Sequence, residues 1–168
     1  QPRFAQDIVL IVEDLPCPPG WHVLALPPHR GQIGGMSIPP RFPVAPEQID
    51  RVVAVFYGAV RRHEVLGPVF ANHVSDWPEH EAKIAAFWRN AILFQRVYDG
   101  NPMRVHRAAG DVRAEHFRDW LALFDATLTR LLPEDTAQAW SALAHRIGAG
   151  LRMGVEDLHA PAGPPVLR

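Results

Sequence analysis

The sequence predicts an all-α protein, and three observations support this prediction. Apolar residues recur at helical spacing throughout residues 46–156. The same stretch contains no alternating pattern of the kind that strands require, and no internal repeat or heptad run. Ten of the 17 prolines precede residue 47, which divides the chain into a Pro-rich first quarter and a helical remainder. With 168 residues, the chain has room for one compact domain.

These boundaries define three regions. Residues 1–45 are expected to form an irregular, Pro-rich extension, residues 46–157 the helical domain, and residues 158–168 a frayed tail. The extension contains Trp21, Val23, Leu24 and Met36. A solvated linker would contain more Ser, Lys and Glu, so we expect the extension to pack on the main domain.

The first two long helices follow proline-containing starts. Pro46 occupies a position where a first helical residue tolerates proline, and apolar residues then recur at Ile49, Val52, Val53, Phe56 and Val60. A second helical pattern opens after Ser75, Asp76 and Pro78, with His80, Ile84, Phe87, Trp88 and Ala91 on one face. His80 is therefore predicted on the face that enters the core.

The second half of the domain begins with a turn. Asp99-Gly100-Asn101-Pro102 is a strong turn signal, and the piece that follows it, Met103 to Ala109, is short and contains His106. Helical spacing returns at Phe117, Trp120, Leu121, Phe124 and Leu128. After Pro133 and the capping candidate Asp135, it continues at Trp140, Leu143, Ala144, Ile147 and Leu151. Four substantial helices joined by short connectors are expected.

Composition excludes several function classes. Seventeen Lys and Arg against 18 Asp and Glu give a net charge of −1, which argues against nucleic acid or an acidic membrane as partner. The single cysteine, Cys17, excludes an intramolecular disulfide, a cysteine zinc site and covalent haem attachment, and it fits a reducing cytoplasm. No unbroken apolar stretch approaches the roughly 20 residues of a membrane helix. We therefore expect a cytoplasmic protein.

The residues alone leave the chemistry open. No HExxH, GxGxxG or GxxxxGK[ST] motif is present among the nine histidines and 12 glycines. Two histidines on separate segments, His80 and His106, lie among many aromatic residues, a pattern that suits a haem pocket with one imidazole on the iron. Aromatic stripes at helical spacing are, however, more often plain core.

A longer series of residues decides between these readings. It comprises Phe56-Tyr57, Leu66-Gly67-Pro68-Val69-Phe70, Trp77, His80, Lys83-Ile84, Phe87-Trp88, Tyr98-Asp99-Gly100-Asn101-Pro102, His106, His116-Phe117 and Trp120-Leu121-Ala122-Leu123-Phe124. In composition and spacing, this series closely resembles the group III (P-type) truncated haemoglobins, over about residues 46–155. The resemblance implies a truncated globin fold, two helices stacked over two others, with b-type haem between them.

The resemblance also implies site residues. The family's proximal histidine, the iron ligand, falls on His106, and its polar ligand-side residues fall on Tyr57, His80 and Trp120, all of which are hydrogen-bond donors. Because Tyr57 follows Phe56 directly, the two point about 100° apart on a helix, so only one of them faces the pocket centre. The expected haem contacts are Phe56, Phe70, Lys83, Ile84, Phe87, Trp88, Met103, Arg107 and Phe117, with Lys83 and either Arg104 or Arg107 as partners of the haem propionates.

Several functions remain open on this scaffold. The first is binding of O2, with NO and CO as further ligands, as in oxygen transport. The second is a haem enzyme, a nitric oxide dioxygenase or a peroxidase-like protein, which would need a separate reductase because no flavin or nicotinamide motif is visible. The third is a haem-based sensor that uses the extension, which is longer than the family's few leading residues and places His22 and His29 as candidates near the pocket, or as part of a dimer contact. A haem-free helical interaction domain is the remaining alternative.

Overall fold

The computed structural model describes residues 38–159, and every regular element in this range is an α-helix. The predicted all-α class is confirmed. The helices are α1 (Pro46–Val60), α2 (Leu66–Ala71), α3 (Trp77–Leu93), α4 (Pro102–Ala109), α5 (Ala114–Leu131) and α6 (Glu134–His159). Within the described residues, no helix is long and apolar enough to cross a membrane.

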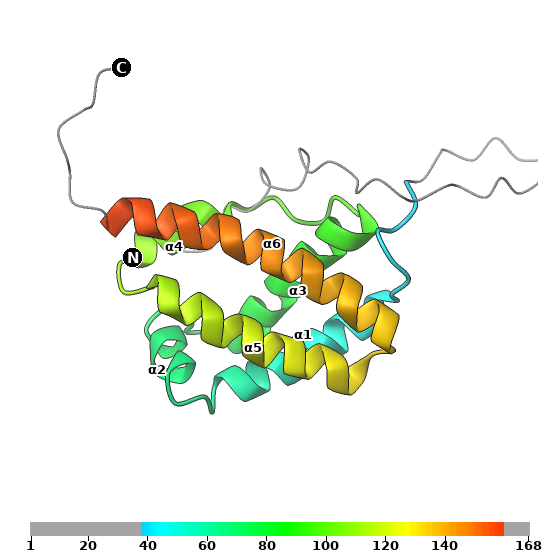
Figure 1. Ribbon diagram of the computed structural model, residues 1–168, viewed down its shortest axis with the longest axis horizontal. Helices are drawn as coiled ribbons and strands as arrows, with labels where there is room; N and C mark the ends of the chain where they lie inside the picture. Colours follow the sequence, from blue (N-terminus) through cyan, green and yellow to red (C-terminus); the bar gives the residue numbers. More distant parts are fainter. Residues whose placement is uncertain (1–37, 160–168) are drawn as a thin grey trace, which may run out of the picture.

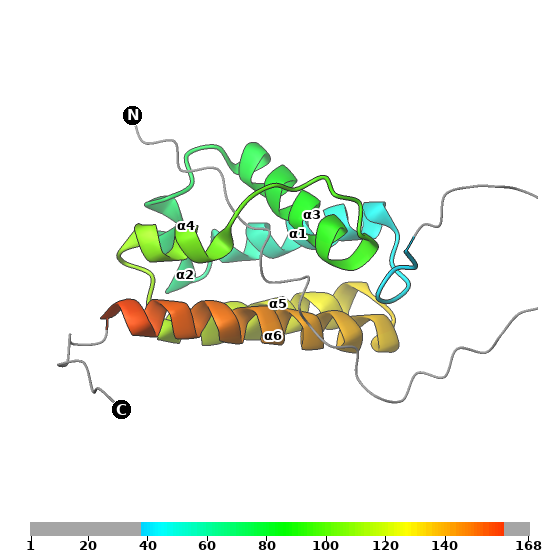
Figure 2. The same cartoon turned by 90° about the horizontal axis from the view of Figure 1, so that it is seen from above.

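The helices form two stacked layers. α1 packs against α3 in one layer, and α5 packs against α6 in the other (Figures 1 and 2). The layers meet where α1 contacts α5, and α4 packs against α6. Figure 2 shows α5 and α6 running side by side beneath α1 and α3. This is the expected arrangement of two helices over two others.

The long helices start where the sequence places caps. Ala45 precedes Pro46, and the Ala45 backbone N–H donates to the Gln48 side chain at 2.9 Å. The Asp76 carboxylate accepts from the Glu79 backbone N–H at 2.9 Å. Such bonds satisfy backbone donors that have no partner within the helix.

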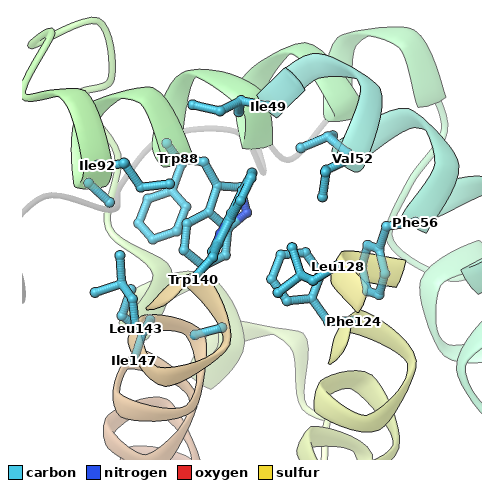
Figure 3. Close-up of a cluster of buried hydrophobic side chains, with 14 of the residues drawn as sticks. Ile49, Val52, Phe56, Trp88, Ile92, Phe124, Leu128, Trp140, Leu143 and Ile147 are labelled. Carbon is cyan, nitrogen blue, oxygen red and sulfur yellow. The ribbon is translucent and has the colours of Figure 1, made fainter. Parts of the chain in front are cut away.

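The core is built from aromatic side chains of four helices. Trp88 of α3 stacks on Phe124 of α5, with ring centroids 5.4 Å apart and planes 11° apart. Phe56 of α1 and Trp140 of α6 meet Phe124 edge-on (Figure 3). Leu128, Ile49 and Val52 fill the space around these rings. Both layers therefore share one continuous core.

The segment before α1 is attached to this core. Phe42 is buried against Trp140, and the Arg41 backbone N–H donates to the Ile92 carbonyl at 2.9 Å. The expected contacts of Trp21, Val23, Leu24 and Met36, the single cysteine Cys17, and the candidates His22 and His29 lie outside the described residues.

The structure differs from the sequence prediction in four local features. A connector after α1 contains the additional helix α2, and the short piece around His106 is the two-turn helix α4. Asp135 is not the cap of α6, because that helix already begins at Glu134 and Asp135 lies in its first turn, where a carboxylate favours the helix dipole. The last helix also continues to His159, beyond the expected boundary at residue 157.

Candidate functional site

All six helices contribute to one cavity of about 240 Å³ between the layers. Most of its lining is apolar, and the polar groups are few. The lining residues, in chain order, are Tyr57, Leu66, Val69, Phe70, His73, Val74, His80, Lys83, Ile84, Phe87, Trp88, Tyr98, Pro102, Val105, His106, Ala109, Val112, His116, Phe117, Trp120, Ala144, Ile147, Gly148 and Leu151. A cavity of this kind suits a flat, apolar ligand with a few polar contacts.

Tyr57 and Trp120 form a polar pair in the cavity wall. Tyr57 is only 2% exposed, and burial raises the pKa of its hydroxyl, while a hydrogen bond from Trp120 lowers it. An indole nitrogen can only donate, so Trp120 Nε1–H donates to the Tyr57 oxygen. The Tyr57 hydroxyl hydrogen stays available for another acceptor. The three expected donors are therefore not equivalent, because Trp120 acts on Tyr57.

His80 presents an unused polar atom to the same region. Its ring lies 4.7 Å from the Tyr57 ring, edge-on, and its Nε2 is buried without a hydrogen-bond partner. Burial, aided by the nearby charge of Lys83, lowers the pKa of His80 to about 4. The imidazole is therefore neutral at pH 7. A buried nitrogen without a partner is unfavourable unless a ligand supplies one.

The position of His80 depends on the start of α3. Arg61, at the end of α1, pairs with Glu81 and places its guanidinium 4.6 Å from the centre of the Trp77 ring. Trp77 in turn contacts the His80 ring at 6.0 Å. These contacts tie the first turn of α3 to α1 and fix where His80 enters the cavity.

His106 comes from α4 and has a defined tautomer. Its Nδ1 lies 2.8 Å from the Pro102 carbonyl oxygen, one helical turn earlier. A carbonyl only accepts, so Nδ1 bears the hydrogen and Nε2 of the neutral ring bears the lone pair. Burial lowers the pKa of His106 and outweighs the bond to Pro102, which raises it. The lowered pKa favours the neutral ring. This is the state in which histidine binds iron.

Six other predicted contact residues line the cavity, namely Phe70, Lys83, Ile84, Phe87, Trp88 and Phe117. Three do not. Phe56 lies behind Tyr57 and Trp120, with which its ring makes edge contacts at 5.0 Å and 4.9 Å. Met103, Arg104 and Arg107 line a separate shallow depression beside α4, and Met103 also packs against the core next to Gly154 of α6. For Arg107 the reason is rotational, because it follows His106 directly on the helix and points about 100° away from it.

The sequence prediction also missed part of the lining. His73, Tyr98 and His116 are polar or amphipathic residues of the lining that lie in or next to connecting segments. Gly148 and Ile147 bring α6 into the wall. A Cβ on Gly148 would lie 3.3 Å from Leu121 Cδ1, so the glycine allows α5 and α6 to approach closely beside the cavity. Ile147 had a signal in its place in the helical period, and Tyr98 and His116 in the series of residues that carries the resemblance, whereas His73 and Gly148 had none.

The residues fit the haem that the sequence led us to expect. The cavity offers the neutral imidazole of His106, whose Nε2 bears the lone pair, together with apolar walls and a buried His80 Nε2 that lacks a partner. In residues 38–159 no group of three or more His, Cys, Asp or Glu side chains is placed to hold a metal ion alone. An iron carried within a macrocycle needs only one protein ligand.

Comparison with known proteins gives a consistent result. No family model matches the sequence. The chain is 34% identical over 93 residues to a protein of Campylobacter jejuni described as a group 3 truncated hemoglobin, covering 53% of this chain and 73% of that protein. It also resembles the crystal structure of a group III truncated hemoglobin from Campylobacter jejuni, with a TM-score of 0.66 and 29% identity, over 71% of this chain and 97% of the other.

Proposed function

The chain belongs to the group 3 truncated haemoglobins, and from this premise we propose that it binds b-type haem through His106 and takes up O2, and also NO or CO, beside Tyr57 and His80. When bound, haem supplies an iron that coordinates small gases and transfers more electron density to O2 than to CO. The observation that carries the proposal is the 2.8 Å contact between His106 Nδ1 and the Pro102 carbonyl inside an apolar cavity.

His106 is suited to the role of proximal ligand by its anchoring. The hydrogen bond to Pro102 fixes the rotation of the ring and increases the electron density at Nε2. Ring contact with Phe117, at 5.4 Å between centroids, restricts the imidazole further. Few rotamers therefore remain to be lost when the iron binds.

Tyr57 and His80 are proposed as the donors to the gas ligand. The Tyr57 oxygen accepts from Trp120 through a lone pair, so this bond does not use the hydroxyl hydrogen, which can be donated to a ligand. Polarisation by that bond makes the hydroxyl a stronger donor. His80 can donate from Nε2 in the appropriate tautomer. Donors of this kind favour O2 over CO, since O2 carries more negative charge.

The burial of His80 favours binding over the peroxidase-like alternative. General acid–base catalysis works best with a group whose pKa lies near the working pH. Burial lowers the pKa of His80 to about 4, so this side chain exchanges protons poorly at pH 7. Turnover measured with a separate reductase would distinguish a ligand-binding protein from a peroxidase-like enzyme and from a nitric oxide dioxygenase. We propose the cytoplasm as the setting, and cell fractionation tests it.

Absorption spectra of the purified chain test the proposal. The oxidised, reduced and CO-bound forms should show a Soret band that shifts with each state, and His106→Ala should lose it or give a weakly ligated form. Added imidazole should restore the spectrum of that variant by filling the space of the lost ring. His145→Ala is the control, because His145 lies on the α5–α6 surface, bonded to Asp125 at 2.8 Å. A spectrum indifferent to His106 would refute the assignment.

A further inference from the structure

A group of three polar side chains connects two edges of the cavity. His73 Nε2, just after α2, lies 2.5 Å from Asp111 Oδ1 in the α4–α5 connection. Asn72 Nδ2 donates to the other carboxylate oxygen, Oδ2, at 3.1 Å. Both oxygens of Asp111 are thus bound to the end of α2. Asp111 is itself held in place by a backbone hydrogen bond to Ala109 at 2.7 Å.

The group lies at the boundary between the cavity and solvent. His73 lines the cavity, yet its side chain is 35% exposed, and that of Asp111 is 42% exposed. His106 is close enough for the charge of His73 to contribute to lowering the pKa of His106. The bonded side chains therefore stand across an opening of the cavity, on the side of the iron-binding histidine.

Helix packing does not close this opening. In the part of the chain that the structure describes, α2 packs against α1 and α5, whereas α4 packs against α6. Both views place α2 and α4 at the same end of the molecule (Figures 1 and 2). The gap between them is crossed by the bonds from Asn72 and His73 to Asp111.

The carboxylate of Asp111 is in its charged form. Slight burial raises its pKa, but the hydrogen bonds from His73 and Asn72 outweigh this and hold the pKa below its ordinary value. The two bonds to Asp111 are therefore charge-assisted on the acceptor side, which makes them stronger than neutral hydrogen bonds.

We propose that Asn72, His73 and Asp111 form a clasp that slows the loss of haem. The proposal rests on the function proposed above. A flat macrocycle leaves through the opening only when α2 and the α4–α5 connection move apart, and the clasp bonds break first. Partly exposed bonds to a charged group have modest effects, so we expect loss of the clasp to accelerate haem release about two- to fivefold. His73 and Asp111 are positioning residues here and need not touch the iron.

Transfer of haem from the loaded full chain to excess apomyoglobin, followed in the Soret region, measures this rate. Asp111→Asn and His73→Leu should each accelerate transfer about two- to fivefold, and the double variant should be no faster than either one. Asp125→Asn is a matched control. Asp125 also receives two side chains, Ser141 at 2.7 Å and His145 at 2.8 Å, but on the α5–α6 surface. It should transfer haem at the wild-type rate.

Salt provides a readout that a purely structural role would not give. High salt screens the charge of the partly exposed Asp111 carboxylate, so it should accelerate transfer from the wild type and leave the rate of Asp111→Asn nearly unchanged. If the wild type holds haem through His106 but Asp111→Asn and Asp125→Asn release haem at equal rates, the clasp alone is overturned. A wild type that takes up no haem would overturn the clasp and the proposed function together.

Discussion

Replacing Tyr57 with phenylalanine removes one oxygen atom from the cavity and leaves the ring in place. The ring is held by contacts to Phe56 at 5.0 Å, Phe70 at 5.7 Å and His80 at 4.7 Å, so the loss is that of a hydrogen bond and not of packing. A buried donor to a charged acceptor contributes about 1 to 3 kcal/mol. At about 1.4 kcal/mol per factor of ten, O2 dissociation should accelerate roughly 5- to 150-fold. CO dissociation should change much less.

Stopped-flow replacement of O2 by CO measures this rate. Tyr98→Phe is the matched control, because Tyr98 also lines the cavity and is also buried, but it lies in the α3–α4 connection against Phe87. It should alter the rate by no more than about twofold. An equal effect of both substitutions would show that the Tyr57 hydroxyl does not donate to the ligand.

The hydrogen bond from Trp120 to Tyr57 makes a second, sharper test possible. In the wild type, Trp120 acts by polarising the hydroxyl, so Trp120→Phe should have a modest effect on O2 release. In Tyr57→Phe the indole N–H loses its acceptor and becomes free for the ligand. Trp120→Phe should therefore accelerate O2 dissociation by a larger factor in the Tyr57→Phe background than in the wild type. Equal effects in both backgrounds would refute the pairing.

Three further predictions concern stability. In the haem-free chain, the free energy of unfolding should fall as the pH is lowered from 6.5 to about 4, because the unfolded chain binds a proton at His80 before the folded chain does, in which the pKa of His80 is about 4. His80→Leu should remove up to about 3 kcal/mol of this fall. Urea denaturation at several pH values measures it. Gly150→Ala should raise the free energy of unfolding by about 0.5 to 1 kcal/mol, since nothing packed around it lies within 4 Å of the added Cβ, whereas Gly154→Ala should gain less, because the end of the Met103 side chain must move aside; thermal denaturation measures both. Asp125→Ala should cost about 1 kcal/mol in chemical denaturation, because two side chains of α6 lose their acceptor.

The sequence predicted the long helices well because their core faces repeat along the chain. Ile49, Val52 and Phe56 recur at helical spacing, and all three are buried as expected. The six-residue helix α2 offered no such signal, since it is too short for a period and begins with Leu66-Gly67-Pro68. Gly67 is required by a close approach between α2 and the end of α1, because a Cβ there would lie 3.1 Å from the Arg61 carbonyl oxygen. Local periodicity carries no information about that approach.

The same distinction separates the cavity residues that were predicted from those that were missed. The expected distal residues, Tyr57, His80 and Trp120, line the cavity, and their roles toward a ligand stay predictions. His73 was missed because its partner Asp111 is 38 residues away, a pairing that only the folded chain creates. Arg107, in contrast, does not line the cavity, because it follows His106 directly on α4 and points about 100° away from it; its contact with a haem propionate stays a prediction.

The spacing between the Asn101-Pro102 turn and His106 explains why so short a helix can position a ligand to iron. The Asn101 side chain accepts from the Arg104 backbone N–H at 3.0 Å, which fixes the first residue of α4. Pro102 is preorganised for that first position, and its carbonyl points along the helix axis toward the residue one turn later. That residue is His106, whose Nδ1 bonds to this carbonyl at 2.8 Å. One turn of chain therefore sets the start of the helix, the direction of the imidazole and its tautomer together, so a shift of one residue in this spacing would rotate the ring about 100° out of the cavity.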